Sequence, residues 1–73
     1  MSQIKYNVYG RIILTQKSEK GWNLYYLGDE GKMRPADDLM VPSFIEENEL
    51  EEYLSDICHE WVSDQHPDIY RIS

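Results

Sequence analysis

The stretch LEEYLSDICHEWV, residues 50–62, decides the fold that this 73-residue sequence predicts. Its apolar residues recur at spacings of three and four, which is typical of an amphipathic helix with one buried face. The apolar positions are Leu50, Tyr53, Leu54, Ile57, Cys58, Trp61 and Val62. The sequence therefore predicts a helix that runs through this stretch and packs its apolar side on another element.

The residues around this stretch indicate where the helix begins and ends. Glu46 is the favoured N-cap, because Ile45 before it and Leu50 at the fourth helical position form a hydrophobic staple. Two other residues suit the cap position, namely Ser43 and Asn48. Pro67 disfavours helical geometry in the residue before it and ends the helical region.

The N-terminal half predicts strands. Residues 4–15 alternate with period two and are interpreted as one strand. One face would carry Ile4, Tyr6, Val8, Ile12 and Leu14. Gly10 falls at a core position of this strand, where it would mark a bulge, a bend or space for Trp61. Residues 22–27 form a second strand, with Trp22, Leu24 and Tyr26 on one face, and the turn 17–21 joins the two as an antiparallel hairpin.

The predicted fold is a small α+β domain that spans residues 1–73. An antiparallel β-hairpin or three-strand meander packs on one amphipathic C-terminal helix, and residues 69–72 add a final short strand. The third strand would be residues 32–34, because Pro35 ends it. The lone cysteine, Cys58, excludes an intramolecular disulfide, so the fold must depend on packing.

An apolar segment with a proline, residues 39–45, predicts extended chain laid across the domain. It would cover the second face of the hairpin, which carries Tyr9, Ile13, Tyr25 and Leu27. That face is otherwise a protein-binding or dimer face. A single-stranded nucleic-acid platform is the least favoured interpretation, because the net charge of the chain is −7.

Charge is strongly segregated along the chain. Residues 35–70 contain eleven Asp and Glu but no Lys or Arg, whereas residues 1–34 contain six bases and three acids. This distribution argues against a general nucleic-acid binder and favours a protein partner with a basic surface. We expect a cytoplasmic protein, because no secretory signal or membrane span is recognisable. We also expect a monomer or weak homodimer.

An acidic ridge is predicted on the exposed side of the helix, formed by Glu49, Glu52, Asp56 and Glu60. It could occupy a basic groove of a partner, although simple solubility explains such a face as well. Glu52, Asp56 and His59 could together hold a divalent cation, but an ordinary Asp56–His59 pair is the favoured interpretation. No metal or other cofactor is therefore expected.

Two further groups of residues favour structural roles. Arg34 can pair with Asp37 or Asp38 and fix a turn, with a functional loop as the alternative. Cys58 and His59 are adjacent on a helix, so their side chains diverge by about 100° and cannot act as nucleophile and base. Cys58 is interpreted as a small buried hydrophobe. No catalytic residues are predicted.

Several short stretches resemble a family of short bacterial proteins described as a domain of unknown function. They are residues 7–11, Gly31-Lys32, residues 34–38, Val41-Pro42 and residues 59–61. The resemblance implies a stand-alone bacterial protein and supplies no activity. The sequence therefore predicts a non-catalytic protein-binding or regulatory accessory protein. The alternative is a small divalent-metal-binding protein or metal-dependent enzyme.

Overall fold

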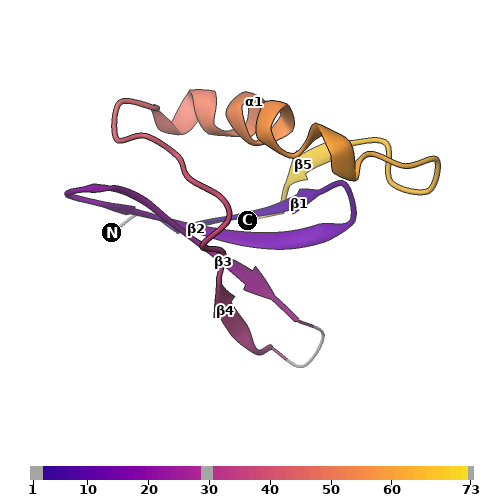
Figure 1. Cartoon of the computed structure of the whole chain (residues 1–73), viewed down its shortest axis with the longest axis horizontal. Helices are drawn as coiled ribbons and strands as arrows, with labels where there is room; N and C mark the ends of the chain where they lie inside the picture. The colour runs from indigo at the N-terminus through magenta and orange to yellow at the C-terminus, as the bar shows by residue number, and fades with distance from the viewer. Residues whose placement is uncertain (1–2, 29–30, 73) are drawn as a thin grey trace.

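Antiparallel pairing organises the chain into one sheet beneath a helix (Figure 1). The computed structural model describes residues 3–28 and 31–72, and these form a five-stranded sheet of order β4-β3-β2-β1-β5. The strands are β1 (Gln3–Val8), β2 (Arg11–Ser18), β3 (Gly21–Leu27), β4 (Met33–Pro35) and β5 (Ile69–Arg71). The helix α1 (Glu47–Ile57) is followed by a 3-10 turn, η1 (His59–Trp61). The predicted α+β class is confirmed.

A two-residue turn at Tyr9-Gly10 separates β1 from β2, so the interpretation of residues 4–15 as one strand is wrong. Val8 pairs with Arg11 across the turn, and both turn residues have positive φ, 51° for Tyr9 and 91° for Gly10. Positive φ at both positions matches the right-handed twist of the strands that the turn joins. The Asn7 side-chain oxygen accepts a hydrogen bond from the Gly10 N–H at 2.8 Å, which fixes the turn.

The turn changes which β2 residues face the helix. Ile4, Tyr6 and Val8 of β1 are buried as predicted, but their companions on β2 are Ile13 and Thr15. The Thr15 hydroxyl donates to the Ile4 carbonyl at 2.9 Å, so this buried polar group is satisfied. Ile12 and Leu14, expected in the core, lie on the opposite face of the sheet because successive side chains of a strand alternate.

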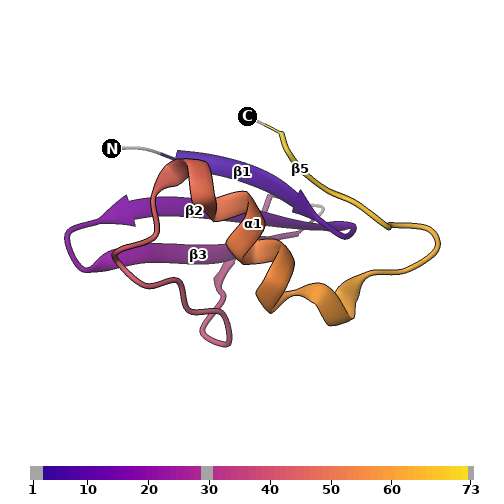
Figure 2. The ribbon, with the colours of Figure 1, turned by 90° about the horizontal axis from the view of Figure 1, so that it is seen from above.

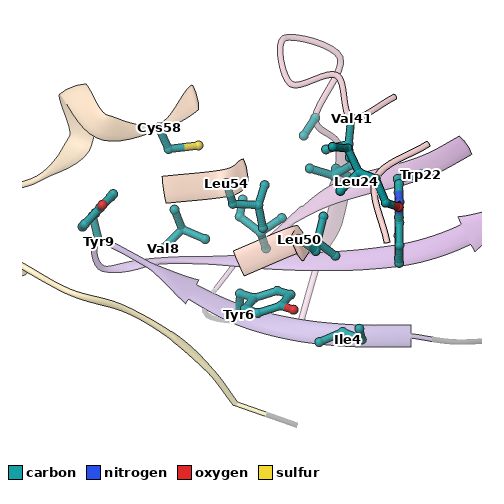
Figure 3. Close-up of a cluster of buried hydrophobic side chains, with 13 residues drawn as sticks. Ile4, Tyr6, Val8, Tyr9, Trp22, Leu24, Val41, Leu50, Leu54 and Cys58 are labelled. Atoms are coloured by element: carbon teal, nitrogen blue, oxygen red, sulfur yellow. The ribbon is translucent and has the colours of Figure 1, made fainter. Parts of the chain in front are cut away.

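The helix α1 crosses the sheet over β1, β2 and β3 (Figure 2). It buries Leu50 and Leu54 completely, and Figure 3 shows both side chains pointing toward the sheet. The predicted face of β3 is confirmed, because Trp22 and Leu24 are buried and Tyr26 packs against the core. The core therefore lies in one layer between α1 and the sheet.

The chain between β4 and α1 lies on the same face of the sheet as α1. Val41 and Ile45 are buried there, and Trp22 Nε1 donates to the Ile45 carbonyl at 2.9 Å. Lys17 Nζ donates to the Ser43 carbonyl at 3.1 Å, which ties the segment to β2. The expectation that residues 39–45 cover the second face of the sheet is therefore wrong.

The helix begins as predicted and ends earlier than predicted. Glu46 is the N-cap of α1. Cys58 leaves helical geometry with φ −109° and ψ 16°, so the Trp61 side chain is carried by η1 and not by α1. Gly10 lies beneath His66 and not beneath Trp61, because a Cβ at Gly10 would meet the imidazole at 2.7 Å. In the described part of the chain, no helix has the length and apolar character needed to cross a membrane.

Candidate functional site

The acidic ridge is exposed along its whole length. Glu49, Glu52 and Asp56 lie on α1, and Glu60 lies on η1 beyond the end of the helix. One of these four carboxylates has a local role, because Glu49 Oε1 accepts a hydrogen bond from the Glu46 N–H at 3.1 Å. This contact satisfies a free backbone donor at the helix start. For the carboxylates of Glu52, Asp56 and Glu60, no hydrogen bond to another described residue is recorded.

Bases within the protein do little to neutralise this ridge. Among the described residues, an ion pair from Arg71 Nη1 to Glu47 Oε1 at 3.6 Å involves a helix acid outside the ridge. Both side chains are about half exposed, 53% and 52%, so the pair contributes little. For Glu52, Asp56 and Glu60, no ion pair is recorded with any described residue.

Two bases of the N-terminal half instead contact aromatic rings. The Arg11 guanidinium lies 4.2 Å from the centroid of Trp61, and Lys17 Nζ lies 4.8 Å from the centroid of Trp22. Such cation–π contacts contribute about 0.5–1 kcal/mol each when exposed. Trp61 also packs near Tyr26, with ring centroids 6.1 Å apart. Two cations are thus used to hold aromatic side chains and not to balance the helix acids.

The structure does not form the metal site that was considered at Glu52, Asp56 and His59. Among residues 3–28 and 31–72, no group of three His, Cys, Asp or Glu side chains could hold a metal ion. His59 is exposed as predicted, but α1 ends at Ile57, so the imidazole no longer follows the helical spacing from Asp56. The described residues therefore do not bring Glu52, Asp56 and His59 together as a three-ligand site.

The loop after β4 is fixed differently from the prediction. The Tyr26 hydroxyl donates to both oxygens of Asp38, at 3.0 and 2.9 Å, and the structure records no ion pair between Arg34 and Asp37 or Asp38. Partial burial and the hydrogen bond to Asp38 raise the pKa of Tyr26 to about 12. A tyrosine on β3 thus takes the structural role that was assigned to Arg34.

An open hollow of about 640 Å³ lies at one end of the sheet, beside the Tyr9-Gly10 turn. Its walls come from β2, β3, β4 and the chain next to them, and they include Arg11, Arg34 and Lys32. All three side chains are exposed. Sequence reasoning did not find this hollow, because Arg11 lies on β2, Arg34 on β4 and Lys32 just before β4, and only the sheet register brings these segments together.

Cys58 is fully buried, which confirms the prediction of a small core residue. Burial and the negative charge of Asp38 raise the pKa of this thiol to about 11. The thiol therefore stays protonated at neutral pH, and a protonated thiol is a poor nucleophile. The geometry around Cys58 and His59 gives no indication of catalysis.

The second face of the sheet carries apolar side chains on the side opposite α1, where the end of β3 and β4 project away from the helix (Figure 1). Ile12 and Leu14 of β2 share this face with Tyr25 and Leu27 of β3, because side chains on paired strands line up across the sheet. Edge residues extend it, and Met33, Tyr70 and Ile72 are 50%, 53% and 46% exposed. We call this the open sheet face.

The grouping of Tyr9 and Ile13 with Tyr25 and Leu27 was therefore wrong. The Tyr9 hydroxyl is hydrogen-bonded to Ser55 Oγ of α1 at 2.8 Å, and Ile13 is fully buried under the helix. Only Tyr25 and Leu27 lie on the open sheet face. The sequence signal for this face was the run Ile12-Ile13-Leu14, which has apolar residues in both phases of the alternation.

Comparison with known proteins gives a family without a function. No curated protein matches the chain. No solved structure matches it either. One family model, described as a domain of unknown function (DUF7661), matches residues 3–73, which is nearly the whole chain. The resemblance to a domain of unknown function is thereby confirmed, and the chain belongs to the DUF7661 family.

Proposed function

We propose that this chain is a non-catalytic accessory protein that binds a partner protein through the acidic ridge of α1 and η1. The observation that supports the proposal is the exposed, uncompensated charge of Glu52, Asp56 and Glu60. A complementary basic surface would relieve the repulsion between these acids and would be steered to them over a distance. Nothing in the family or in the described geometry indicates catalysis.

The contacts of the bases also favour a partner outside the chain. The Arg11 guanidinium packs on the Trp61 ring and Lys17 Nζ packs on the Trp22 ring, so both cations contribute to packing. Salt or a basic partner molecule would then neutralise the ridge more effectively than these two cations do. The compartment we propose is the cytoplasm, where a lone reduced thiol such as that of Cys58 is the ordinary state.

The test compares three baits in affinity purification from the native host, followed by mass spectrometry. The baits are the wild-type chain, the ridge variant Glu52→Gln/Asp56→Asn, and the control variant Glu19→Gln/Asp64→Asn. Both variants remove two exposed negative charges, but the control residues lie in turns away from the ridge on α1. We expect the wild type and the control to recover the same basic protein and the ridge variant to lose it.

A titration of the recovered protein with each purified variant completes the test. Affinity for the wild type should fall between about 50 and 200 mM NaCl, because exposed charges are screened. The ridge variant should bind more weakly and with a smaller salt dependence. Equal affinity for ridge and control variants, or recovery of no basic protein by any bait, would contradict the proposal.

A further inference from the structure

The hollow at the end of the sheet forms where β3 departs from β2. The recorded pairs between these two strands begin with Ile13 and Tyr26, although β2 starts two residues earlier and β3 continues one residue beyond Tyr26. In Figure 1 the end of β3 projects away from α1 together with β4. The two strands therefore open a wedge, and the hollow of about 640 Å³ lies in it, between residues 10–12 and residues 26–28.

Two arginines reach this hollow from the strands on either side of β3. Arg34 on β4 is directly opposite Tyr26 in the register. Arg11 on β2 lies two residues before Ile13, which is the β2 partner of Tyr26, so Arg11 and Arg34 belong to the same face of the sheet. The strands β2 and β4 are about 10 Å apart, or two strand spacings, which two long arginine side chains can span between them.

Arg11 is held in place by aromatic packing. Its guanidinium carbon lies over the Trp61 ring, 4.2 Å from the centroid, and Trp61 packs in turn near Tyr26. Stacking uses the face of a guanidinium and leaves the N–H donors at its edge available for forked hydrogen bonds to an oxyanion. Neither Arg11 nor Arg34 has a recorded ion pair with a described residue, so both arginines can offer these donors to a ligand.

We propose that the hollow binds a small molecule with a phosphate group, and that Arg11 and Arg34 hold the phosphate. The described residues that line the hollow include three cations and no acid. Asp38, which accepts the Tyr26 hydroxyl, is not among them. A phosphate dianion has charge and oxygens for two guanidinium groups, whereas one arginine satisfies a carboxylate.

The remaining walls of the hollow suit an apolar or aromatic part of the same ligand. Ile12 and Leu27 line it beside the arginines. Its volume lies within the range of about 300–1,000 Å³ that is usual for small-molecule sites, which is more than a single inorganic anion needs. The net charge of −7 repels anions from most of this protein, so binding of an anion depends on the local cations of the hollow.

The test titrates the isotope-labelled chain with three probes and follows its amide signals by NMR. The probes are phenyl phosphate, inorganic phosphate and benzoate, at about pH 7.5, where a phosphate monoester carries close to two negative charges, and at a constant ionic strength of about 0.1 M. We expect phenyl phosphate to bind with a dissociation constant of about 0.1–1 mM and to shift the signals of residues 10–12 and 26–28. Inorganic phosphate and benzoate should each bind at least about fivefold more weakly, because each lacks one part of the ligand.

Arginine variants identify the groups that hold the phosphate. Arg11→Gln and Arg34→Gln each remove one cation from the hollow, and Arg71→Gln is the matched control, because Arg71 lies on β5 at the other edge of the sheet. Arg34 is exposed on the edge strand β4, so Arg34→Gln should keep the fold even if Arg11→Gln loses stability with the Trp61 contact. We expect Arg34→Gln to raise the dissociation constant of phenyl phosphate about tenfold and Arg71→Gln to leave it unchanged.

The same titration separates this inference from the proposed function. The ridge variant Glu52→Gln/Asp56→Asn should bind phenyl phosphate like the wild type, because the ridge does not line the hollow. Three results would each overturn the proposal: no shift of the hollow residues at about 20 mM phenyl phosphate, binding of either other probe as tightly as phenyl phosphate, or equal effects of Arg34→Gln and Arg71→Gln.

Discussion

Gly10 is the residue whose replacement tests the β1–β2 turn most directly. Its φ of 91° is open to glycine and unfavourable for other residues, and an added Cβ would lie 2.7 Å from the His66 ring. Left-handed backbone costs about 1–2 kcal/mol for an L-residue, and the contact adds to that cost. We expect Gly10→Ala to lower the melting temperature by about 8 °C or more, since about 1 kcal/mol corresponds to 4–8 °C at this size.

Gly31 provides the matched control for this prediction. It also has a positive φ, 78°, but a Cβ there would meet nothing within 4 Å. Gly31→Ala therefore reports backbone strain alone and should cost less than Gly10→Ala. Adding His66→Ala should recover part of the Gly10→Ala loss, because it removes the ring that the new Cβ meets. If thermal melts showed an equal loss of stability in the two glycine variants, the contact with His66 would not contribute to the cost of Gly10→Ala.

The turn at Tyr9-Gly10 also explains why sequence reasoning misplaced a strand. Hairpin turns of this type are recognised by Asn-Gly or Asp-Gly, and a tyrosine with positive φ is uncommon. The apolar run Ile12-Ile13-Leu14 fits either phase of an alternating strand. Pattern alone could not choose the phase, and a shift of one residue exchanges the two faces of β2.

At the scale of elements, the start of α1 was predictable and its end was not. The staple of Ile45 and Leu50 around Glu46 is a local signal that needs no tertiary information. The apolar spacing of Cys58 and Trp61 continues past the true end at Ile57. Trp61 is apolar at a helical spacing, but its ring packs on Tyr26 and Arg11 from η1. Only the tertiary contact distinguishes these two placements.

A prediction at the N-terminus of α1 distinguishes a ridge acid that stabilises the fold, Glu49, from one that does not, Glu52. Glu49→Ala removes the carboxylate that accepts the Glu46 N–H, so it should cost about 0.5–1 kcal/mol, measured by urea unfolding. Glu52→Ala removes the same charge without a recorded hydrogen bond, and it also relieves the like-charge pair with Asp56 four residues on. Glu52→Ala should therefore change stability by less than about 0.5 kcal/mol. Equal losses in the two variants would mean that the capping contact is not formed in solution.

For the whole molecule, composition and charge pattern were sufficient for the fold class but not for the arrangement of surfaces. Alternation, helical spacing and the lone cysteine predicted an α+β protein held by packing. The open sheet face was not predictable, because it depends on the β2 phase, on β5 pairing with β1, and on which side residues 39–45 lie. These are long-range choices that the local pattern does not determine. The exposed positions of Glu49, Glu52 and Asp56 followed from helical spacing alone.

The last prediction concerns how the folded chain responds to salt. The 14 acids outnumber the seven bases, and folding concentrates much of the excess on α1 and η1. Screening acts over about 10 Å at 0.1 M salt, which covers neighbouring ridge acids. We expect the melting temperature of the protein to rise by about 4–8 °C between roughly 10 and 200 mM NaCl if about 1 kcal/mol of repulsion is relieved.

Two comparisons make this salt effect diagnostic. The ridge variant Glu52→Gln/Asp56→Asn should show a smaller rise than the control Glu19→Gln/Asp64→Asn, because only the former relieves repulsion on the ridge. Melts at two protein concentrations check that self-association, which makes melting temperatures depend on concentration, does not contribute. A melting temperature that falls with salt would mean that ion pairs across the domain outweigh the repulsion. The acidic ridge would then already be balanced within the protein, and a basic partner would gain little by binding it.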